Sequence, residues 1–144
     1  MDQFGQMVDI YDFSGQGKYI LLELSASWCS PCNQLSAWMT HGDLEVTNQT
    51  WWKSSYFQLK PWIESGEIIF INVQYGDEYR DNASLASIQN WYSRYPHDMV
   101  PVLADSEKLL QVEHEKTLSS ISSNAVAKSD TKSLSIFIIY IPNL

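Results

Sequence analysis

The chain holds two cysteines, Cys29 and Cys32, with only a Ser-Pro pair between them. They follow an apolar run, residues 18–24 (KYILLEL), whose length and composition predict a strand buried on both faces. Pro31 suits the first turn of a helix, and Gly42 suits the end of one. The CSPC motif is therefore expected where a strand passes directly into a helix, which restricts the folds open to the chain.

Patterns typical of strands and helices alternate along the rest of the sequence. Helices are predicted over residues 31–41, 52–63 and 85–95, with a helical turn or two within 108–115. Further strands are predicted over 67–75, 100–105 and 134–141, and a serine-rich loop over 119–133. We expect Pro61 to break or kink the second helix. This alternation predicts one α/β domain over residues 1–144, with a mainly parallel sheet.

Composition and charge narrow the classes of function. Seventeen acidic against nine basic residues give a net charge of −8, which opposes a phosphate backbone and predicts no nucleic-acid partner. No run of 18 apolar residues is present, so no transmembrane segment is expected. The first 15 residues carry neither a basic region nor an apolar one, so no signal peptide is predicted and the compartment stays open.

The expected position of the cysteine pair gives it a chemical role. Unpaired N–H groups at a helix N-terminus stabilise a thiolate, and CxxC thiols placed there have lowered pKa values. Cys29, normally the more exposed of such a pair, is expected to attack, and Cys32 to resolve the mixed disulfide. The alternatives are two inert buried cysteines or part of a zinc site. The three histidines are scattered singly, so no metal and no cofactor are predicted.

Three stretches carry a family resemblance: YILLELSASWCSPC after Gly17-Lys18, then IIFINVQYGDE, then YPHDMVPVLAD. Over roughly residues 4–115 the sequence resembles the thioredoxin superfamily, particularly bacterial redoxin-type thiol-disulfide oxidoreductases. The resemblance implies a thioredoxin-like fold, a central mostly parallel sheet flanked by helices. It also implies a WCxPC dithiol that exchanges with protein thiols or disulfides, a redox partner protein, and a periplasmic or envelope location.

The resemblance implies further site residues. The family often has a carboxylate six residues before the first cysteine, and Glu23 is there in this chain. In an apolar strand its pKa should rise, which would let it take the proton of Cys32; the alternative is a solvent-facing residue. Trp28 should shield the dithiol and contact substrate together with Ser30 and Pro31. A cis-proline completes the family's substrate groove; Pro142 is favoured for it, with Pro101 as the alternative.

The family pattern continues beyond YIPNL with a hairpin and a closing helix. The chain is therefore expected to be incomplete at the C-terminus, and perhaps the N-terminus, with reduced stability and weak or absent activity. Two rival functions remain beside thiol-disulfide exchange. One is a non-catalytic binding module. The other, a thiol peroxidase, is disfavoured because Ala26 stands where that chemistry needs Thr or Ser. The direction of electron flow, the substrate and the oligomeric state stay open.

Overall fold

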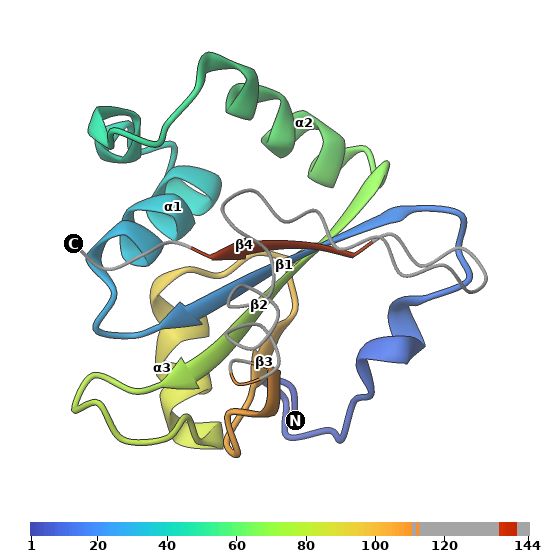
Figure 1. The fold of residues 1–144 in the computed structure, drawn as a ribbon, viewed down its shortest axis with the longest axis vertical. Helices are drawn as coiled ribbons and strands as arrows, with labels where there is room; N and C mark the ends of the chain where they lie inside the picture. Colours follow the sequence, from blue (N-terminus) through green and yellow to red (C-terminus); the bar gives the residue numbers. More distant parts are fainter. Residues whose placement is uncertain (111, 113–135, 141–144) are drawn as a thin grey trace.

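A four-stranded parallel sheet organises the chain in the computed structural model, which describes residues 1–110, 112 and 136–140 (Figure 1). The strand order is β3-β2-β1-β4, and each neighbouring pair runs parallel. The strands are β1 (Tyr19–Ala26), β2 (Ile68–Gly76), β3 (Val102–Ala104) and β4 (Ile136–Tyr140). The strand before the cysteine pair is therefore central, as its apolar composition predicts.

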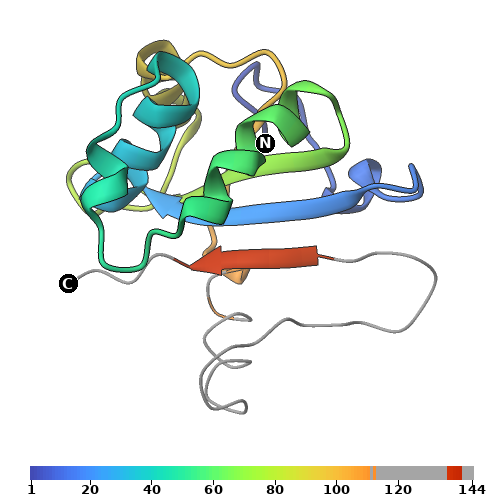
Figure 2. The same cartoon turned by 90° about the horizontal axis from the view of Figure 1, so that it is seen from above.

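The three α-helices cover one face of this sheet, whereas the 3₁₀ helix Ile10–Phe13 packs on the other. The α-helices are α1 (Ser30–His41), α2 (Leu59–Glu64) and α3 (Leu85–Arg94), and three short 3₁₀ helices span Ile10–Phe13, Glu45–Asn48 and Ser54–Gln58. Turned by 90°, the molecule shows α1, α2 and α3 all on the same side of the strands (Figure 2). Among the described residues, no helix is both long enough and apolar enough to cross a bilayer.

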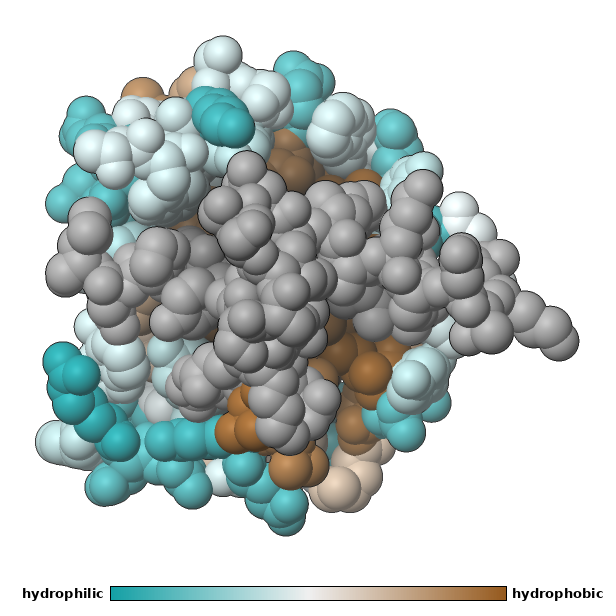
Figure 3. All heavy atoms as spheres, viewed as in Figure 1, coloured by the Kyte–Doolittle hydropathy of each residue, from teal (hydrophilic) through white to brown (hydrophobic). Residues whose placement is uncertain are grey.

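Alternate residues of β1 and β2 point to opposite faces, so the sheet has two hydrophobic layers. Leu21 and Phe70 pack under the helices, while Ile20, Leu22 and Ile71 pack on the opposite face. Where the described residues are visible from that opposite face, hydrophobic residues lie inward of a mostly hydrophilic periphery (Figure 3). Burial of β1 on both faces, predicted from its continuous apolar run, is confirmed.

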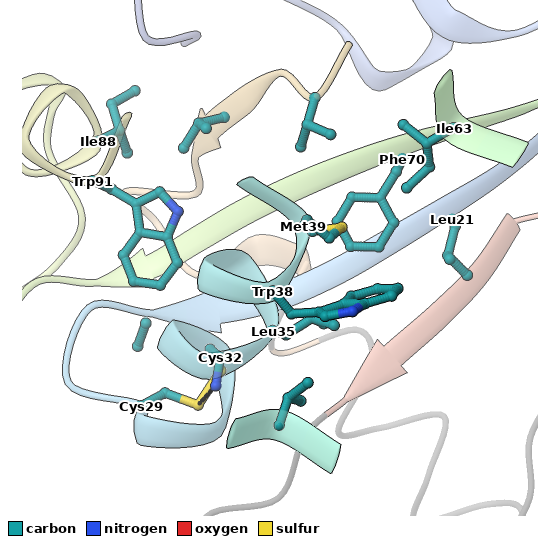
Figure 4. Packing of buried hydrophobic residues seen from close by; sticks show 14 of the residues in the cluster. Leu21, Cys29, Cys32, Leu35, Trp38, Met39, Ile63, Phe70, Ile88 and Trp91 are labelled. Atoms are coloured by element: carbon teal, nitrogen blue, oxygen red, sulfur yellow. Dashed lines mark hydrogen bonds between the residues drawn. A yellow bond between two sulfur atoms is a disulfide. The ribbon is translucent and has the colours of Figure 1, made fainter. Parts of the chain in front are cut away.

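Local signals explain the bounds of α1. Cys29 is the N-cap, and Pro31 lies in the first turn, where a missing N–H costs no helical hydrogen bond. Gly42 ends the helix with a φ of 75°, a left-handed conformation that glycine adopts without a steric penalty. Leu35, Trp38 and Met39 then form the buried side of α1 (Figure 4). The predicted start and end of this helix are confirmed.

The helix predicted over 52–63 is broken, as expected for a segment that contains Pro61, but the break lies ahead of the proline. The 52–63 pattern divides into the 3₁₀ helix Ser54–Gln58 and α2, which begins at Leu59, ahead of the proline. Pro61 is the third residue of α2 and so lies in its first turn, where the missing N–H costs no hydrogen bond within α2.

Two further predictions concern prolines and a loop. The described residues contain no cis peptide bond, so the Val100–Pro101 bond is trans and Pro101 is not a cis-proline. Pro142 and the serine-rich segment 119–133 lie outside the described residues. The remaining strands and α3 fall within about two residues of their predicted ranges.

Candidate functional site

Cys29 and Cys32 form a disulfide where β1 passes into α1 (Figure 4). Their Cα atoms are 5.3 Å apart, within the range that a disulfide requires. The backbone N–H of Cys32 donates to Sγ of Cys29 at 3.3 Å. N–H groups at a helix N-terminus are the groups that would stabilise a Cys29 thiolate once the disulfide is reduced.

Both sulfur-bearing residues are buried. Cys29 is 2% exposed and Cys32 1%, so Cys29 exceeds Cys32 in exposure only marginally and both residues are buried in the disulfide form. Ser30, in contrast, is exposed, and Trp28 and Pro31 are half-buried. The structure thus brings these predicted site residues together in one turn. Trp28, Ser30 and Pro31 are at least partly exposed to solvent, whereas both cysteines are buried.

Trp28 is fixed by three neighbours at the end of the sheet. Its ring packs edge-on against Tyr75 with centroids 6.2 Å apart, and the guanidinium of Arg80 lies 4.4 Å above it. A Cβ atom added at Gly76 would lie 3.0 Å from the indole nitrogen, so this glycine permits the close approach. Arg80 escaped the sequence analysis because the loop after β2 meets the dithiol turn only through the parallel pairing of β1 and β2.

Glu23 is fully buried on the helix-facing side of β1. Burial raises the pKa of Glu23 from 4.5 to about 8, and a hydrogen bond from Asn72 acts in the opposite direction. Nδ2 of Asn72 donates to Oε2 of Glu23 at 2.7 Å. The alternative of a solvent-facing Glu23 is therefore excluded, and near pH 7 the carboxyl group is mostly protonated.

Three more polar side chains surround Glu23 between the sheet and the helices. Nε2 of Gln74 donates to Oδ1 of Asn72 at 2.6 Å and to Oγ of Ser25 at 2.9 Å. Oε1 of Glu23 and Oε1 of Gln74 have no hydrogen-bond partner among the described residues. The sequence analysis missed Asn72 and Gln74. Polar residues at alternate positions of both apolar strands, Glu23 and Ser25 on one and Asn72 and Gln74 on the other, could have indicated a buried polar cluster on one face of the sheet.

Among the described residues, a small cavity borders this polar region and a larger hollow lies away from it. A cavity of about 10 Å³, room for about one water molecule, touches Asn72, Ser36, Thr40, Tyr95 and His97. Burial lowers the pKa of His97 from 6.5. A larger hollow of about 250 Å³ lies at the start of β1, at the other end from the dithiol. Within the described part of the chain, no three His, Cys, Asp or Glu residues are placed to hold a metal ion.

Comparisons with protein-family models, with curated proteins and with solved structures found no match to this chain. The observations that bear on its class are those of the chain itself: a small α/β fold and a disulfide-bonded cysteine pair at CxxC spacing.

Glu23→Gln should remove a pH dependence of stability. Between about pH 4.5 and 8 the folded chain keeps a proton that the unfolded chain releases, so the stability of the native protein falls as the pH rises through this window. The free energy of unfolding of Glu23→Gln minus that of the native protein should therefore increase by about 3–5 kcal/mol from pH 4.5 to pH 8.

Urea unfolding of the disulfide form at several pH values measures this difference. Glu45→Gln changes the net charge equally on an exposed side chain and is the control. A difference for Glu23→Gln that stays constant between pH 4.5 and 8 would show that Glu23 is not buried as described.

Proposed function

We propose that the chain is a thioredoxin-like thiol-disulfide oxidoreductase that exchanges its dithiol with protein thiols or disulfides. The observation that carries the proposal is the Cys29–Cys32 disulfide at the N-terminus of α1. A parallel sheet that ends beside the disulfide supports it, because loops at the carboxyl ends of parallel strands gather functional groups at one edge. Trp28, Ser30 and Pro31 form the rim that substrate contacts.

The exchange proceeds in two steps in the reducing direction. The Cys29 thiolate attacks one sulfur of a substrate disulfide, forms a mixed disulfide and releases the other substrate sulfur as a thiolate. The Cys32 thiolate then attacks Sγ of Cys29, forms the intramolecular disulfide and releases the second substrate thiolate. Two electrons pass to the substrate, whose thiolates take up protons. A redox partner protein reverses these steps to reset the dithiol.

Cys29 is assigned as the nucleophile because of its hydrogen-bond donors. Its Sγ already accepts the Cys32 N–H and lies at the N-cap of a 12-residue helix, where a negative charge is most favourable. Cys32 lies within the first helical turn and has only Cys29 to attack. Because both residues are buried in the disulfide form, a substrate sulfur reaches Cys29 only after a local displacement of the turn.

Glu23 is assigned as the group that takes the proton of Cys32 in the second step. It lies on the side of β1 that α1 covers, and its pKa of about 8 lies near that of an ordinary thiol, about 8.5. Only the ionised fraction of Glu23, which grows as the pH rises toward 8, can accept this proton, and a base with such a pKa is matched to a thiol donor. Pro142, the residue proposed for the cis-proline of the groove, lies outside the described residues.

The burial of both cysteines favours a second candidate. A disulfide with less than 3% exposure at each residue is also what an inert structural bridge in a non-catalytic binding module would show. The two candidates differ in one property: an inert bridge does not exchange with external thiols while the chain is folded. A thiol peroxidase remains disfavoured, since Ala26 supplies no hydroxyl to orient a peroxide.

Single cysteine variants should separate the two steps. Cys32→Ser should accumulate a mixed disulfide between Cys29 and glutathione when the folded protein meets glutathione disulfide, because the resolving thiol is absent. Cys29→Ser should form the adduct more than about tenfold more slowly. Intact-mass spectrometry over time measures both, and accumulation in Cys29→Ser instead would reverse the assignment.

Glu23→Gln should slow resolution while leaving attack by Cys29 within about twofold of native. Loss of the base should slow decay of the mixed disulfide by about tenfold or more. It should also remove the rise in rate that the native protein shows as Glu23 ionises toward pH 8. Rapid acid quench and mass analysis follow the decay, with Glu45→Gln as control. Equal rates for native and Glu23→Gln at every pH from 5 to 9 would rule out this role.

A further inference from the structure

Asn33, the residue directly after the dithiol, connects three parts of the molecule through its side-chain amide. Nδ2 donates to the backbone carbonyl of Ser27 at 3.0 Å and to that of Cys29 at 2.8 Å. Oδ1 accepts from the Tyr95 hydroxyl at 3.0 Å and from the Arg94 guanidinium at 3.5 Å. Both donors and both acceptor positions of the amide are therefore used.

Further backbone hydrogen bonds hold the turn of residues 27–29, to which Nδ2 of Asn33 donates. The N–H of Ser27 donates to the carbonyl of Gly76, and the N–H of Cys29 donates to the carbonyl of Ala26, both at 2.9 Å. The carbonyls of residues 27 and 29 are the groups that Asn33 binds. The side chain thus completes the hydrogen bonding of the turn that presents Cys29, rather than capping the free N–H groups of its own helix.

Tyr95, which donates to Oδ1 of Asn33, is itself held in place by the buried end of α3. Tyr95 is the C-cap of α3; its N–H donates to the carbonyl of Trp91, and its ring packs on Trp91 with centroids 5.0 Å apart. Trp91 is 1% exposed and belongs to the same core cluster as the two cysteines. The ring of His41, the last residue of α1, lies 6.1 Å from the Tyr95 ring, and its Nε2 contacts the Arg94 carbonyl at 2.9 Å. The end of α3 therefore supports both ends of α1.

We propose that Asn33 is a positioning residue for the dithiol: by tying the turn 27–29 to Tyr95, it holds Sγ of Cys29 within reach of Cys32 in the reduced chain as well as in the disulfide. This inference rests on the proposed function, because positioning matters only for a pair that opens and closes. It adds a residue pair, Asn33 and Tyr95, that the CxxC motif does not contain.

Positioning of this kind changes the equilibrium constant for forming the Cys29–Cys32 disulfide. In the reaction of the dithiol with glutathione disulfide, the chain loses two electrons and two protons and gains one S–S bond, while two glutathione thiols are released. The equilibrium constant for this reaction increases with the effective concentration of one thiol at the other. Hydrogen bonds that fix the turn of residues 27–29 keep the two thiols close and so raise this effective concentration. The Asn33 and Tyr95 side chains carry no charge, so the pair acts through geometry rather than by stabilising a thiolate electrostatically.

Three variants test the inference in glutathione buffers of graded composition, with acid quench, alkylation and mass analysis. Asn33→Ala should lower the equilibrium constant for disulfide formation by about three- to tenfold, since two hydrogen bonds to the turn are lost. Tyr95→Phe removes only the hydroxyl donor and should lower it by about two- to threefold. Asn48→Ala, at an exposed position of the 3₁₀ helix Glu45–Asn48, is the matched control and should match the native constant.

The outcomes separate this inference from the proposed function. A native protein that never exchanges with glutathione while folded contradicts the proposed function itself. A native protein that exchanges, with Asn33→Ala and Tyr95→Phe unchanged in their constants, overturns the positioning role alone, even if both variants unfold more easily. If Asn33→Ala fails to fold, Tyr95→Phe decides, because it keeps every ring contact and removes one hydrogen bond.

Discussion

The burial of β1 between two parallel neighbours is the constraint on which the site depends. Its residues are covered on both faces, and β2 and β4 satisfy its backbone on both edges, so the strand cannot shift without exposing apolar side chains. Its carboxyl end therefore delivers the Trp28–Cys29 turn to one place, beside the loop that follows β2. The parallel pairing explains why Arg80, far away in sequence, lies over Trp28.

The same strand carries the energetic cost of the site. Glu23 and Ser25 lie in a largely apolar layer, where among the described side chains Asn72 and Gln74 of β2 donate hydrogen bonds to them. A buried carboxylate with a single donor is costly, and the raised pKa expresses that cost as retention of a proton. The buried carboxyl group therefore lowers the stability of the folded chain as the pH rises toward 8.

Sequence patterns were sufficient where one element determined the outcome. The continuous apolar run predicted β1, Pro31 and Gly42 predicted the ends of α1, and the apolar neighbours of Glu23 predicted its burial. Features that depend on two elements were missed, as with Asn33 and Tyr95, because nothing in either segment shows that α1 and α3 meet there. The near-complete burial of both cysteines was missed for the same reason, since the residues that cover a side chain come from distant parts of the chain.

Alkylation of the folded native protein, followed by intact-mass spectrometry, tests most directly whether the disulfide is a redox pair. The account predicts no added alkyl group in the oxidised protein, two after treatment with a dithiol reductant under native conditions, and none again after re-oxidation by glutathione disulfide. The contrary result is a disulfide that resists the reductant in the folded chain and gains two alkyl groups only after unfolding. That result would make Cys29 and Cys32 an inert structural bridge.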